Sequence, residues 1–217
     1  MASSGVRLPD STPEAERLGS ALLKTGFQRL SGIRLTYLKS VDSTQTFVST
    51  VLRSDHEGDL VISEVQTGGQ GRKGRPWVSH AGGLWMTITL KPPVPQVLEK
   101  IVYVAAKAIV RTLDESGVKE SNIKAPNDVY CKGKKIAGLL ADGVIQGDSC
   151  KVYLGIGINV NNDVSVDDSV SKIATSVARE LGREIDLTKF TVAFLKNLDE
   201  EYVGEIKSLT ERSQPEK

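Results

Sequence analysis

The sequence predicts an α+β fold, with a mixed, largely antiparallel central sheet flanked by helices. Segments in which apolar and polar residues alternate, as they do in strands, cluster in the middle of the chain. Segments with the three-to-four-residue apolar spacing of helices lie mainly toward the two ends of that region. Runs of strands beside runs of helices are typical of this class.

The individual elements follow from the same patterns. Helical spacing predicts helices over residues 13–24, 97–116, 170–180 and 187–206. Another helix is predicted after the N-cap sequence Asp42-Ser43-Thr44, with Phe47, Val48, Val51 and Leu52 pointing inward. Strands are predicted over residues 33–38, 59–62, 84–90, 136–144 and 152–160. Two short extended pieces flank a kink at Pro126-Asn127, and Cys131–Lys135 predicts a hairpin turn.

The length of 217 residues fits one domain of ordinary size with a small appendage. We expect an N-terminal extension with a short helix over residues 1–30, a main domain over residues 31–210, and a frayed tail over residues 211–217. Residues 1–12 are small and polar, so disorder is expected there.

The composition excludes several classes of function. Apolar residues make up 39% and charged residues 25%, as in soluble globular proteins, and the net charge is only +1. A global field that attracts nucleic acid or a membrane surface is therefore not expected. The sequence has no apolar run of about 18 residues and no apolar signal core at its start. Two cysteines and two histidines give no disulfide framework and no metal spacing, so we expect a cytoplasmic protein without a metal site of its own.

A glycine-rich segment, Ser63–Trp77, is the strongest candidate site in the sequence. It contains Gly68, Gly69, Gly71 and Gly74 together with the cations Arg72, Lys73 and Arg75. Closely spaced glycines let the backbone curl so that its N–H groups point at one anion. This combination predicts binding of a polyphosphate or a carboxylate.

Three other interpretations of this segment are possible from its residues. Gly69, Gly71 and Gly74 match the spacing of a dinucleotide fingerprint, but the segment runs into Pro76 rather than opening a helix. The run from Lys73 to Pro76 resembles a minor-groove DNA hook, which usually lies in a disordered basic arm. A solvated basic loop is the plainest alternative, although so many glycines cost much backbone entropy.

Three further features carry open alternatives. Lys124 follows a strand residue and precedes a rigid turn, which would hold an otherwise solvated side chain in place. Glycines within the two long predicted strands indicate a close approach to the backbone, either by a buried ligand or by an aromatic side chain of the core; they are Gly138, Gly155 and Gly157. For Ser43 and Thr44, helix capping alone is the better explanation from pattern.

Four segments, in this order, resemble the motifs of the biotin–protein ligases. They are Gly69-Gln70-Gly71-Arg72-Lys73-Gly74-Arg75, Lys124-Ala125-Pro126-Asn127-Asp128, Lys135-Ile136-Ala137-Gly138-Leu139-Leu140 and Gly155-Ile156-Gly157-Ile158-Asn159-Val160. Asp42-Ser43-Thr44-Gln45 also fits the start of the family's first core helix, and Gly82-Gly83-Leu84-Trp85 looks most like the archaeal branch. The resemblance covers roughly residues 33–202.

The resemblance implies a catalytic domain of the biotin–lipoate ligase type, similar to the class II aminoacyl-tRNA synthetases. Such enzymes join biotin to ATP, giving biotinyl-5′-AMP and pyrophosphate, and then acylate one lysine of a biotin carboxyl carrier domain. The implied ligands and partners are biotin, ATP, Mg²⁺ and that carrier, with no nucleic acid and no membrane. Because family members often dimerise through the central sheet, a homodimer is a further expectation.

The resemblance also implies roles for individual residues. Arg72 and Lys124 would be catalytic. Biotin would be bound by Ser43, Thr44, Gln66, Gly69, Gln70, Arg72, Lys124, Gly138 and Gly157. ATP and the adenylate would be bound by Arg72, Arg75, Trp77, Asn127 and Asn159.

The sequence departs from the family pattern in three places. Ala125 stands where the family has tryptophan, which predicts a cavity costing about 3–5 kcal/mol if nothing fills it. Neither a C-terminal SH3-like barrel nor an N-terminal helix-turn-helix domain is expected in this chain. Two alternatives follow: a lipoate or octanoyl transferase of the same superfamily, or a non-catalytic protein that binds biotin or biotinyl-adenylate.

Overall fold

The computed structural model describes residues 6–7, 12–93, 95–146 and 149–212. Its centre is one eight-stranded sheet with the strand order β1-β2-β3-β4-β8-β7-β6-β5. The strands are β1 (Val6–Arg7), β2 (Arg34–Val41), β3 (Asp59–Gln66), β4 (Leu84–Leu90), β5 (Ser121–Lys124), β6 (Asp128–Cys131), β7 (Lys134–Gln146) and β8 (Ser149–Ile158). The pairs β1–β2 and β2–β3 are parallel and the other pairs are antiparallel, which confirms the predicted mixed, largely antiparallel sheet.

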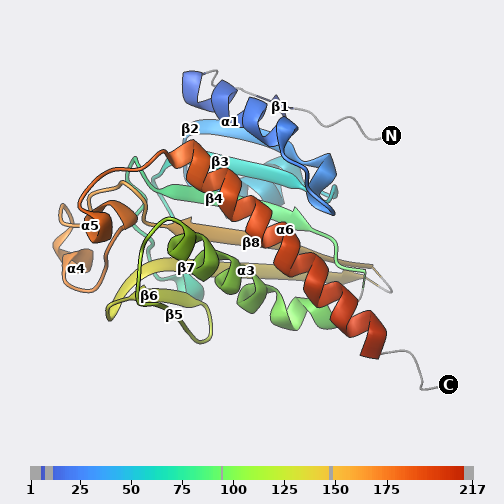
Figure 1. Cartoon of the computed structure of the whole chain (residues 1–217). Coiled ribbons are helices and arrows are strands. Elements are labelled where there is room, and N and C mark those ends of the chain that lie inside the picture. Colours follow the sequence, from blue (N-terminus) through green and yellow to red (C-terminus); the bar gives the residue numbers. More distant parts are fainter. Residues whose placement is uncertain (1–5, 8–11, 94, 147–148, 213–217) are drawn as a thin grey trace.

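Three long helices cover one face of this sheet (Figure 1). They are α1 (Pro13–Lys24), α3 (Gln96–Glu115) and α6 (Leu187–Arg212). Their apolar faces are buried in one core together with alternate residues of the strands, among them Leu18, Ile109 and Phe194. Since α1 belongs to this core, the N-terminal helix packs as part of the main unit.

Shorter elements occupy the other face and the loops. They are α2 (Thr44–Thr46), the π-helix η2 (Phe47–Leu52), α4 (Asp168–Ser171), α5 (Val177–Leu181) and the 3₁₀ turns η1 (Leu30–Gly32) and η3 (Arg72–Gly74). The predicted N-cap is present, because the Ser43 hydroxyl accepts a hydrogen bond from the Thr46 N–H. Lys132 and Gly133 both have positive φ, of 48° and 79°, as a tight hairpin between β6 and β7 requires.

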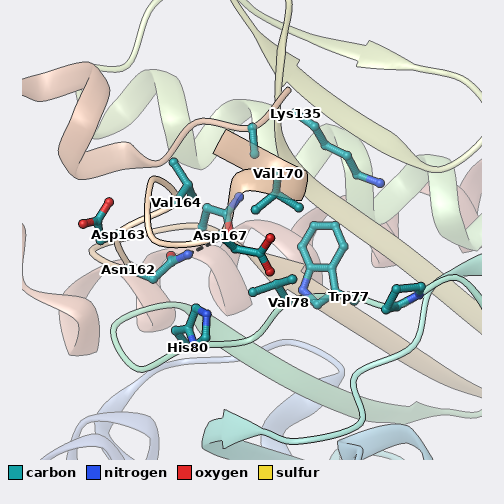
Figure 2. A pocket seen from close by; sticks show the side chains of 12 residues that line it. Trp77, Val78, His80, Lys135, Asn162, Asp163, Val164, Asp167 and Val170 are labelled. Atoms are coloured by element: carbon teal, nitrogen blue, oxygen red, sulfur yellow. Dashed lines mark hydrogen bonds between the residues drawn. The ribbon is translucent and has the colours of Figure 1, made fainter. Parts of the chain in front are cut away.

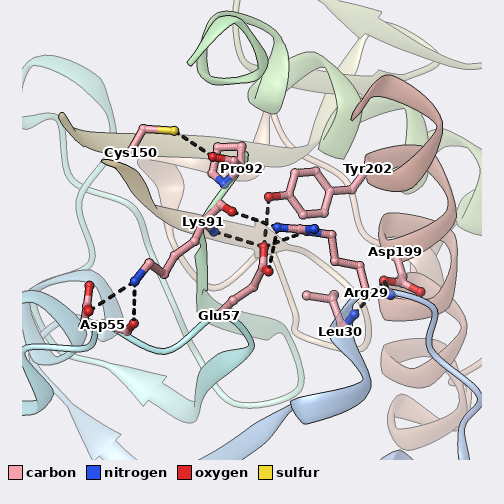
Figure 3. Close-up of polar contacts among 9 residues, drawn as sticks. All are labelled: Arg29, Leu30, Asp55, Glu57, Lys91, Pro92, Cys150, Asp199 and Tyr202. Atoms are coloured by element: carbon pink, nitrogen blue, oxygen red, sulfur yellow. Dashed lines mark hydrogen bonds and ion pairs between the residues drawn. The ribbon is translucent and has the colours of Figure 1, made fainter. Parts of the chain in front are cut away.

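A cluster of polar side chains fastens the segment after α1 to α6 (Figure 3). The Asp199 carboxylate accepts hydrogen bonds from the backbone N–H groups of Gln28, Arg29 and Leu30. Glu57 accepts from the Arg29 guanidinium, the Tyr202 hydroxyl and the Lys91 N–H. Burial and the neighbouring Glu57 raise the pKa of the Tyr202 phenol, which therefore stays neutral. We call Arg29, Glu57, Lys91, Asp199 and Tyr202 the Glu57 cluster.

The predicted helix after Ser43 is wrong in its detail. Its backbone continues as a π-helix, in which each residue turns through less than the 100° of an α-helix. Val48 is fully buried as predicted, but Val51 is rotated toward solvent and is 65% exposed. Phe47 and Leu52 pack against the same cluster as Val48, so the predicted inward positions are wrong only at Val51.

Other elements also differ from the prediction in their limits, and the following differences have a structural reason. Strand β3 runs on to Gln66, since Ser40 and Val41 of β2 continue to pair with it. The helix predicted over residues 170–180 is two short helices, because Ala174 between them forms a β-bridge to Lys135. Residues 6–7, expected to be disordered, pair with β2. The frayed tail predicted over residues 211–217 lies largely outside the described residues.

Candidate active site

The main cleft lies on the face of the sheet opposite to α3 and α6. Along β4 and β8, the residues that join the helix-covered core alternate with residues that face this cleft, such as Thr87, Gly155 and Gly157. The cleft has a volume of about 490 Å³. It is lined from Ser43 to Gln45, by Gln66, by Gln70 to Lys73, by Arg75 to Trp77, and by residues of β4, β6, β7 and β8.

The glycine-rich loop forms one wall of the cleft and is a tight, internally bonded turn. The Gly71 N–H donates to the Arg75 carbonyl and the Trp77 N–H donates to the Gly69 carbonyl, at 2.7 and 2.8 Å. A Cβ on Gly69 would lie 2.5 Å from the Trp77 carbonyl oxygen, so only glycine fits there. Because some loop N–H groups are used inside the loop, anion binding must depend strongly on the cations.

The cations of the glycine-rich loop line the cleft, and one of them contacts the turn before β6. These cations are Arg72, Lys73 and Arg75, and all three are exposed. The Arg72 guanidinium lies 3.4 Å from the Asn127 side-chain oxygen, and the Asn127 amide donates to the Leu139 carbonyl at 2.8 Å. This connects the loop to the turn before β6. Such a concentration of positive charge suits a polyanionic ligand.

Lys124 and Lys135, which belong to neighbouring motifs, lie differently relative to the cleft. Lys124, predicted to be catalytic, is exposed and does not line the cleft; its ammonium lies 4.4 Å from the centre of the Tyr130 ring. Lys135, which the sequence analysis placed in a hairpin turn and in the third motif without a role of its own, lines it. The Lys135 ammonium pairs with Asp128 at 2.7 Å and lies 4.9 Å from the centre of the Trp77 ring. The signal that could have found it is its place three residues before Gly138, within the third motif.

The neighbouring motif position, Ala125, is exposed. The small side chain therefore opens onto solvent, and the predicted buried cavity does not arise there. The peptide bond between Ala125 and Pro126 is cis, and Pro126 lines the cleft.

The indole of Trp77 explains two of the strand glycines. A Cβ on Gly157 would lie 2.5 Å from the Trp77 Nε1, and one on Gly138 would lie 3.0 Å from the same ring. The ring also meets Trp85 edge to face, with centroids 6.3 Å apart. The group that lies against both glycines is thus Trp77, an aromatic side chain of the protein. The buried Trp77 Nε1 has no hydrogen-bond partner among the described residues, so a ligand acceptor could satisfy it.

The other end of the cleft is polar and uncharged. The Thr44 N–H and hydroxyl lie 2.9 and 3.1 Å from the Gln66 side-chain oxygen. The Gln66 amide nitrogen donates to the Ser79 hydroxyl at 2.9 Å. Ser43 and Thr44 are 4% and 3% exposed, so they belong to the floor of the cleft rather than to the surface. A ligand with a polar head and an anionic tail fits a cleft with these two ends.

A second, smaller pocket of about 60 Å³ adjoins the cleft (Figure 2). Trp77 and Lys135 line both cavities, and the loop before α4 closes the far side. Asn159 lines only this pocket; its amide donates to the Thr175 carbonyl and accepts from Asn162. Hydrogen bonds from Ser169 lower the pKa of Asp167. This wall is therefore built by the β8 end and the segment before α4.

Most of the predicted site residues are thus brought together. The main cleft is lined by Ser43, Thr44, Gln66, Gln70, Arg72, Arg75, Trp77, Asn127, Gly138 and Gly157. Gly69 is buried behind the cleft, Asn159 lies in the smaller pocket, and Lys124 lies outside. The roles predicted for these residues remain predictions. The sequence analysis missed Gln45, Thr87 and Lys135.

The residues around this cleft place the chain in a family. Residues 37–159 match the biotin/lipoate A/B protein ligase family, which is more than half of the 217 residues. The chain belongs to this family.

Individual relatives agree with that assignment. The "Bifunctional ligase/repressor BirA" of Bacillus subtilis is 35% identical over 83% of this chain and 56% of its own length. The "Biotin--[acetyl-CoA-carboxylase] ligase" of Paracoccus denitrificans is 32% identical over 60% of this chain and 57% of its own. The biotin protein ligase of Aquifex aeolicus, solved in complex with biotin and ATP, is 30% identical with a TM-score of 0.69, covering 80% of this chain and 72% of that chain. The chain thus spans little more than half the length of these curated relatives.

Proposed function

We propose that this chain is the catalytic domain of a biotin–protein ligase. It activates biotin with ATP as biotinyl-5′-AMP and transfers the biotinyl group to one lysine of a biotin carboxyl carrier domain. The observation that carries this proposal is a single cleft with a hydrogen-bonding end at Thr44 and Gln66 and a cationic end at Arg72 and Lys135. The named relatives, which include biotin–protein ligases, support it.

In the first step, a carboxylate oxygen of biotin attacks the α-phosphorus of ATP. The bond from that phosphorus to the bridging oxygen of the leaving group breaks, and pyrophosphate departs with the electron pair. Both reactants are anions, so cations and N–H donors must offset their repulsion and hold them in line. Arg72 and Arg75 come from the glycine-rich loop, and Lys135 comes from strand β7 of the sheet.

The position of Lys135 favours it over Lys124 for stabilising charge at the reacting phosphate. Its ammonium already faces the cleft beside Asp128, whereas that of Lys124 faces the Tyr130 ring. Lys124 and Asn127 would then support the turn before β6, which Arg72 of the glycine-rich loop contacts through Asn127. Trp77, placed between the two cavities, would contact both biotin and the nucleotide.

In the second step, the uncharged amine of a carrier lysine attacks the carbonyl carbon of the mixed anhydride. The bond from that carbon to the phosphate oxygen breaks, AMP leaves as an anion, and the amine gives up a proton. Arg72 and Lys135 would stabilise the AMP leaving group. No covalent bond between the enzyme and biotin is needed.

The site suits a magnesium ion that arrives with ATP. Among the described residues, no group of three or more His, Cys, Asp and Glu side chains could hold a metal ion by itself. Mg²⁺ usually binds substrate phosphates and water with one or two carboxylates, and Asp128 lines the cleft. The ion would shield the phosphate charges from the incoming carboxylate.

The remaining proposals concern the setting of the protein. We propose a cytoplasmic enzyme whose partner is the carrier domain and which does not bind nucleic acid or membranes. In the part of the chain that the structure describes, no helix is long and apolar enough to cross a membrane. A homodimer that pairs edges of the central sheet is proposed from the family resemblance alone.

The test is biotin transfer to an apo-carrier domain, followed by mass spectrometry of the target lysine. Complete reactions contain biotin, ATP and Mg²⁺, and matched reactions lack ATP or use a carrier with that lysine replaced by arginine. ATP-dependent modification of the one lysine is expected. Tight biotin binding with no adenylate and no transfer would instead mean a non-catalytic binding protein, and transfer of lipoyl or octanoyl groups would mean the other alternative.

A further inference from the structure

A short extended segment, residues 173–175, connects α4 to α5 and borders both cavities. Ile173 lines the main cleft and Ala174 lines the smaller pocket. Val170, at the end of the same wall, lines both cavities (Figure 2). We call residues 173–175 the bridge segment, because Ala174 forms a β-bridge to Lys135.

The bridge segment is bonded to the backbone of Lys135. The Lys135 N–H donates to the Ile173 carbonyl at 2.8 Å, and the Lys135 carbonyl accepts from the Thr175 N–H at 2.9 Å. Strand β8 ends at Ile158, opposite Ala137, so the bridge segment takes the place beside β7 that β8 leaves open. The position of the bridge segment and that of the Lys135 backbone therefore depend on each other.

The carboxylate of Glu180, in α5, joins the two partners of this bridge. One of its oxygens accepts from the Thr175 hydroxyl at 2.6 Å, and the other lies 3.0 Å from the Lys132 ammonium. Thr175 belongs to the bridge segment, whereas Lys132 lies in the turn that leads into β7. A carboxylate can only accept, so the hydrogen of the Thr175 hydroxyl is committed to it. Glu180 thus binds the segment and the strand at the same time.

The contact between Glu180 and Thr175 lies inside the protein. The Glu180 side chain is 13% exposed and Thr175 is 0% exposed. Burial alone would raise the pKa of Glu180, but hydrogen bonds from Thr175 and Lys132 outweigh it and lower the pKa. A charged acceptor makes a stronger hydrogen bond than a neutral one. Glu180 lines neither cavity, so it acts through the groups that it holds.

We propose that Glu180 is a positioning residue for the nucleotide: by holding the bridge segment on β7, it fixes the wall of the smaller pocket and the backbone from which Lys135 extends. The inference rests on the proposed function, because it takes ATP as the ligand beside Lys135. Loss of the carboxylate would let the bridge segment open locally. The end of the cleft at Thr44 and Gln66 is bonded to other elements and should bind biotin as before.

The first test is steady-state pyrophosphate exchange, with KM for ATP and for biotin measured separately in five variants. Glu180→Ala removes both contacts of the carboxylate, and Thr175→Val removes the hydroxyl at nearly constant size. Glu180→Gln keeps an oxygen that can accept from Thr175, and Lys132→Ala removes only the exposed ion pair. Glu205→Ala is the matched control, because Glu205 is 17% exposed, pairs with Lys100 at 2.7 Å and lines neither cavity.

The expected result is a rise of about fivefold to tenfold in KM for ATP in Glu180→Ala and Thr175→Val. The value of kcat should fall by about threefold to tenfold, since Lys135 is less well placed. KM for biotin should stay constant in both variants. Glu180→Gln should recover most of the loss, and Lys132→Ala should have little effect because exposed ion pairs contribute little. Glu205→Ala should keep both KM values.

The second test is hydrogen exchange followed by mass spectrometry, which needs no activity. The amide of Thr175 is protected by its bond to Lys135, so local opening should raise its exchange rate. We expect exchange in residues 173–177 to be about tenfold faster in Glu180→Ala, and exchange in α3 to be unchanged. A merely structural role would lower the amount of folded enzyme, and hence kcat, without raising KM for ATP alone.

The inference is overturned if Glu180→Ala keeps the original KM for ATP, if KM for biotin rises as much as KM for ATP, or if exchange in residues 173–177 is no faster. Failure of the proposed function is recognised separately, since the original chain then catalyses no biotin-dependent pyrophosphate exchange. In that case calorimetry with ATP replaces the kinetics. Weaker ATP binding by Glu180→Ala than by Glu205→Ala would support the role of Glu180, and equal or absent ATP binding would overturn it.

Discussion

The Glu57 cluster and the Thr44 cluster use similar groups for different purposes. In the Glu57 cluster, the carboxylates of Glu57 and Asp199 meet backbone and side-chain donors within the protein. In the Thr44 cluster, which consists of Thr44, Gln45, Gln66 and Thr87, the side chains bond to one another and also line the cleft. A buried network closed on itself stabilises the fold, whereas a buried network that also lines a cleft can hold a ligand.

This difference separates stability from binding in a way that variants can test. Changes in the Glu57 cluster should lower the free energy of unfolding and leave ligand selectivity alone. Changes at the cleft should act on binding or rate with little effect on unfolding.

Asp199→Ala should produce the largest loss of stability. It removes a buried carboxylate that accepts from the N–H groups of Gln28, Arg29 and Leu30, and leaves those donors unpaired. We expect the free energy of unfolding in urea to fall by about 3–5 kcal/mol. Asp199→Asn, which keeps one acceptor oxygen, should lose about half as much. A loss below about 1 kcal/mol in Asp199→Ala would contradict this account of the cluster.

Lys135→Ala should produce the largest loss of rate. The ammonium lies in the cleft between Asp128 and Trp77, where it would face the reacting phosphate. Removing such a charge costs about 3 kcal/mol of transition-state stabilisation, so pyrophosphate exchange should slow by about a hundredfold. Lys124→Ala tests the role predicted from the motif; from its position on Tyr130 we expect a smaller loss. If Lys124→Ala costs more than Lys135→Ala, the assignment of Lys135 is wrong.

Arg72→Gly should loosen the adenylate without unfolding the protein. Arg72 is exposed and makes one long contact to Asn127, so the free energy of unfolding should change by less than about 0.5 kcal/mol. Weaker retention of biotinyl-5′-AMP should raise biotin incorporation into bystander lysines by about tenfold, measured by mass spectrometry of a mixed protein substrate. Arg53→Gly, an exposed arginine outside the cleft with φ of 45°, is the control. Unchanged selectivity for the carrier lysine in Arg72→Gly would contradict the proposed role.

Tyr202→Phe should have the smallest effect. It removes the hydroxyl that donates to Glu57 at 3.0 Å and should cost about 1 kcal/mol in unfolding free energy. Burial raises the pKa of Tyr202, so the folded phenol keeps its proton above pH 10 while the unfolded one loses it. Stability from this group is therefore complete below about pH 10 and falls above it. Tyr202→Phe should flatten that part of the pH dependence, and an unchanged slope would exclude Tyr202 as its source.

Much of the fold could be predicted from the sequence because its long elements have strong periods. The limits of α1 and β4 agree with the prediction, and α3 differs by one residue at each end. The helix after Ser43 was misjudged at Val51, since nothing in the sequence distinguishes a π-helix from an α-helix. The helix over residues 170–180 was predicted whole because the bridge from Ala174 to Lys135 is a tertiary contact.

The site could be predicted in part because several of its residues belong to contiguous sequence motifs. Residues in contiguous motifs, such as Arg72 and Asn127, were found and lie together. Gln45 and Thr87 could not be found, because their importance depends on which side chain each meets across the sheet. For Gly138 and Gly157, the alternative of an aromatic neighbour describes what the structure shows, in the form of Trp77.

Exchange of labelled pyrophosphate into ATP, with biotin, lipoate and octanoate compared side by side, tests whether this chain activates biotin. We expect exchange that depends on Mg²⁺ and biotin and is at least about a thousandfold slower with the two acids that lack N–H donors. Equal exchange with lipoate, or no exchange with biotin while biotin still binds, would contradict it.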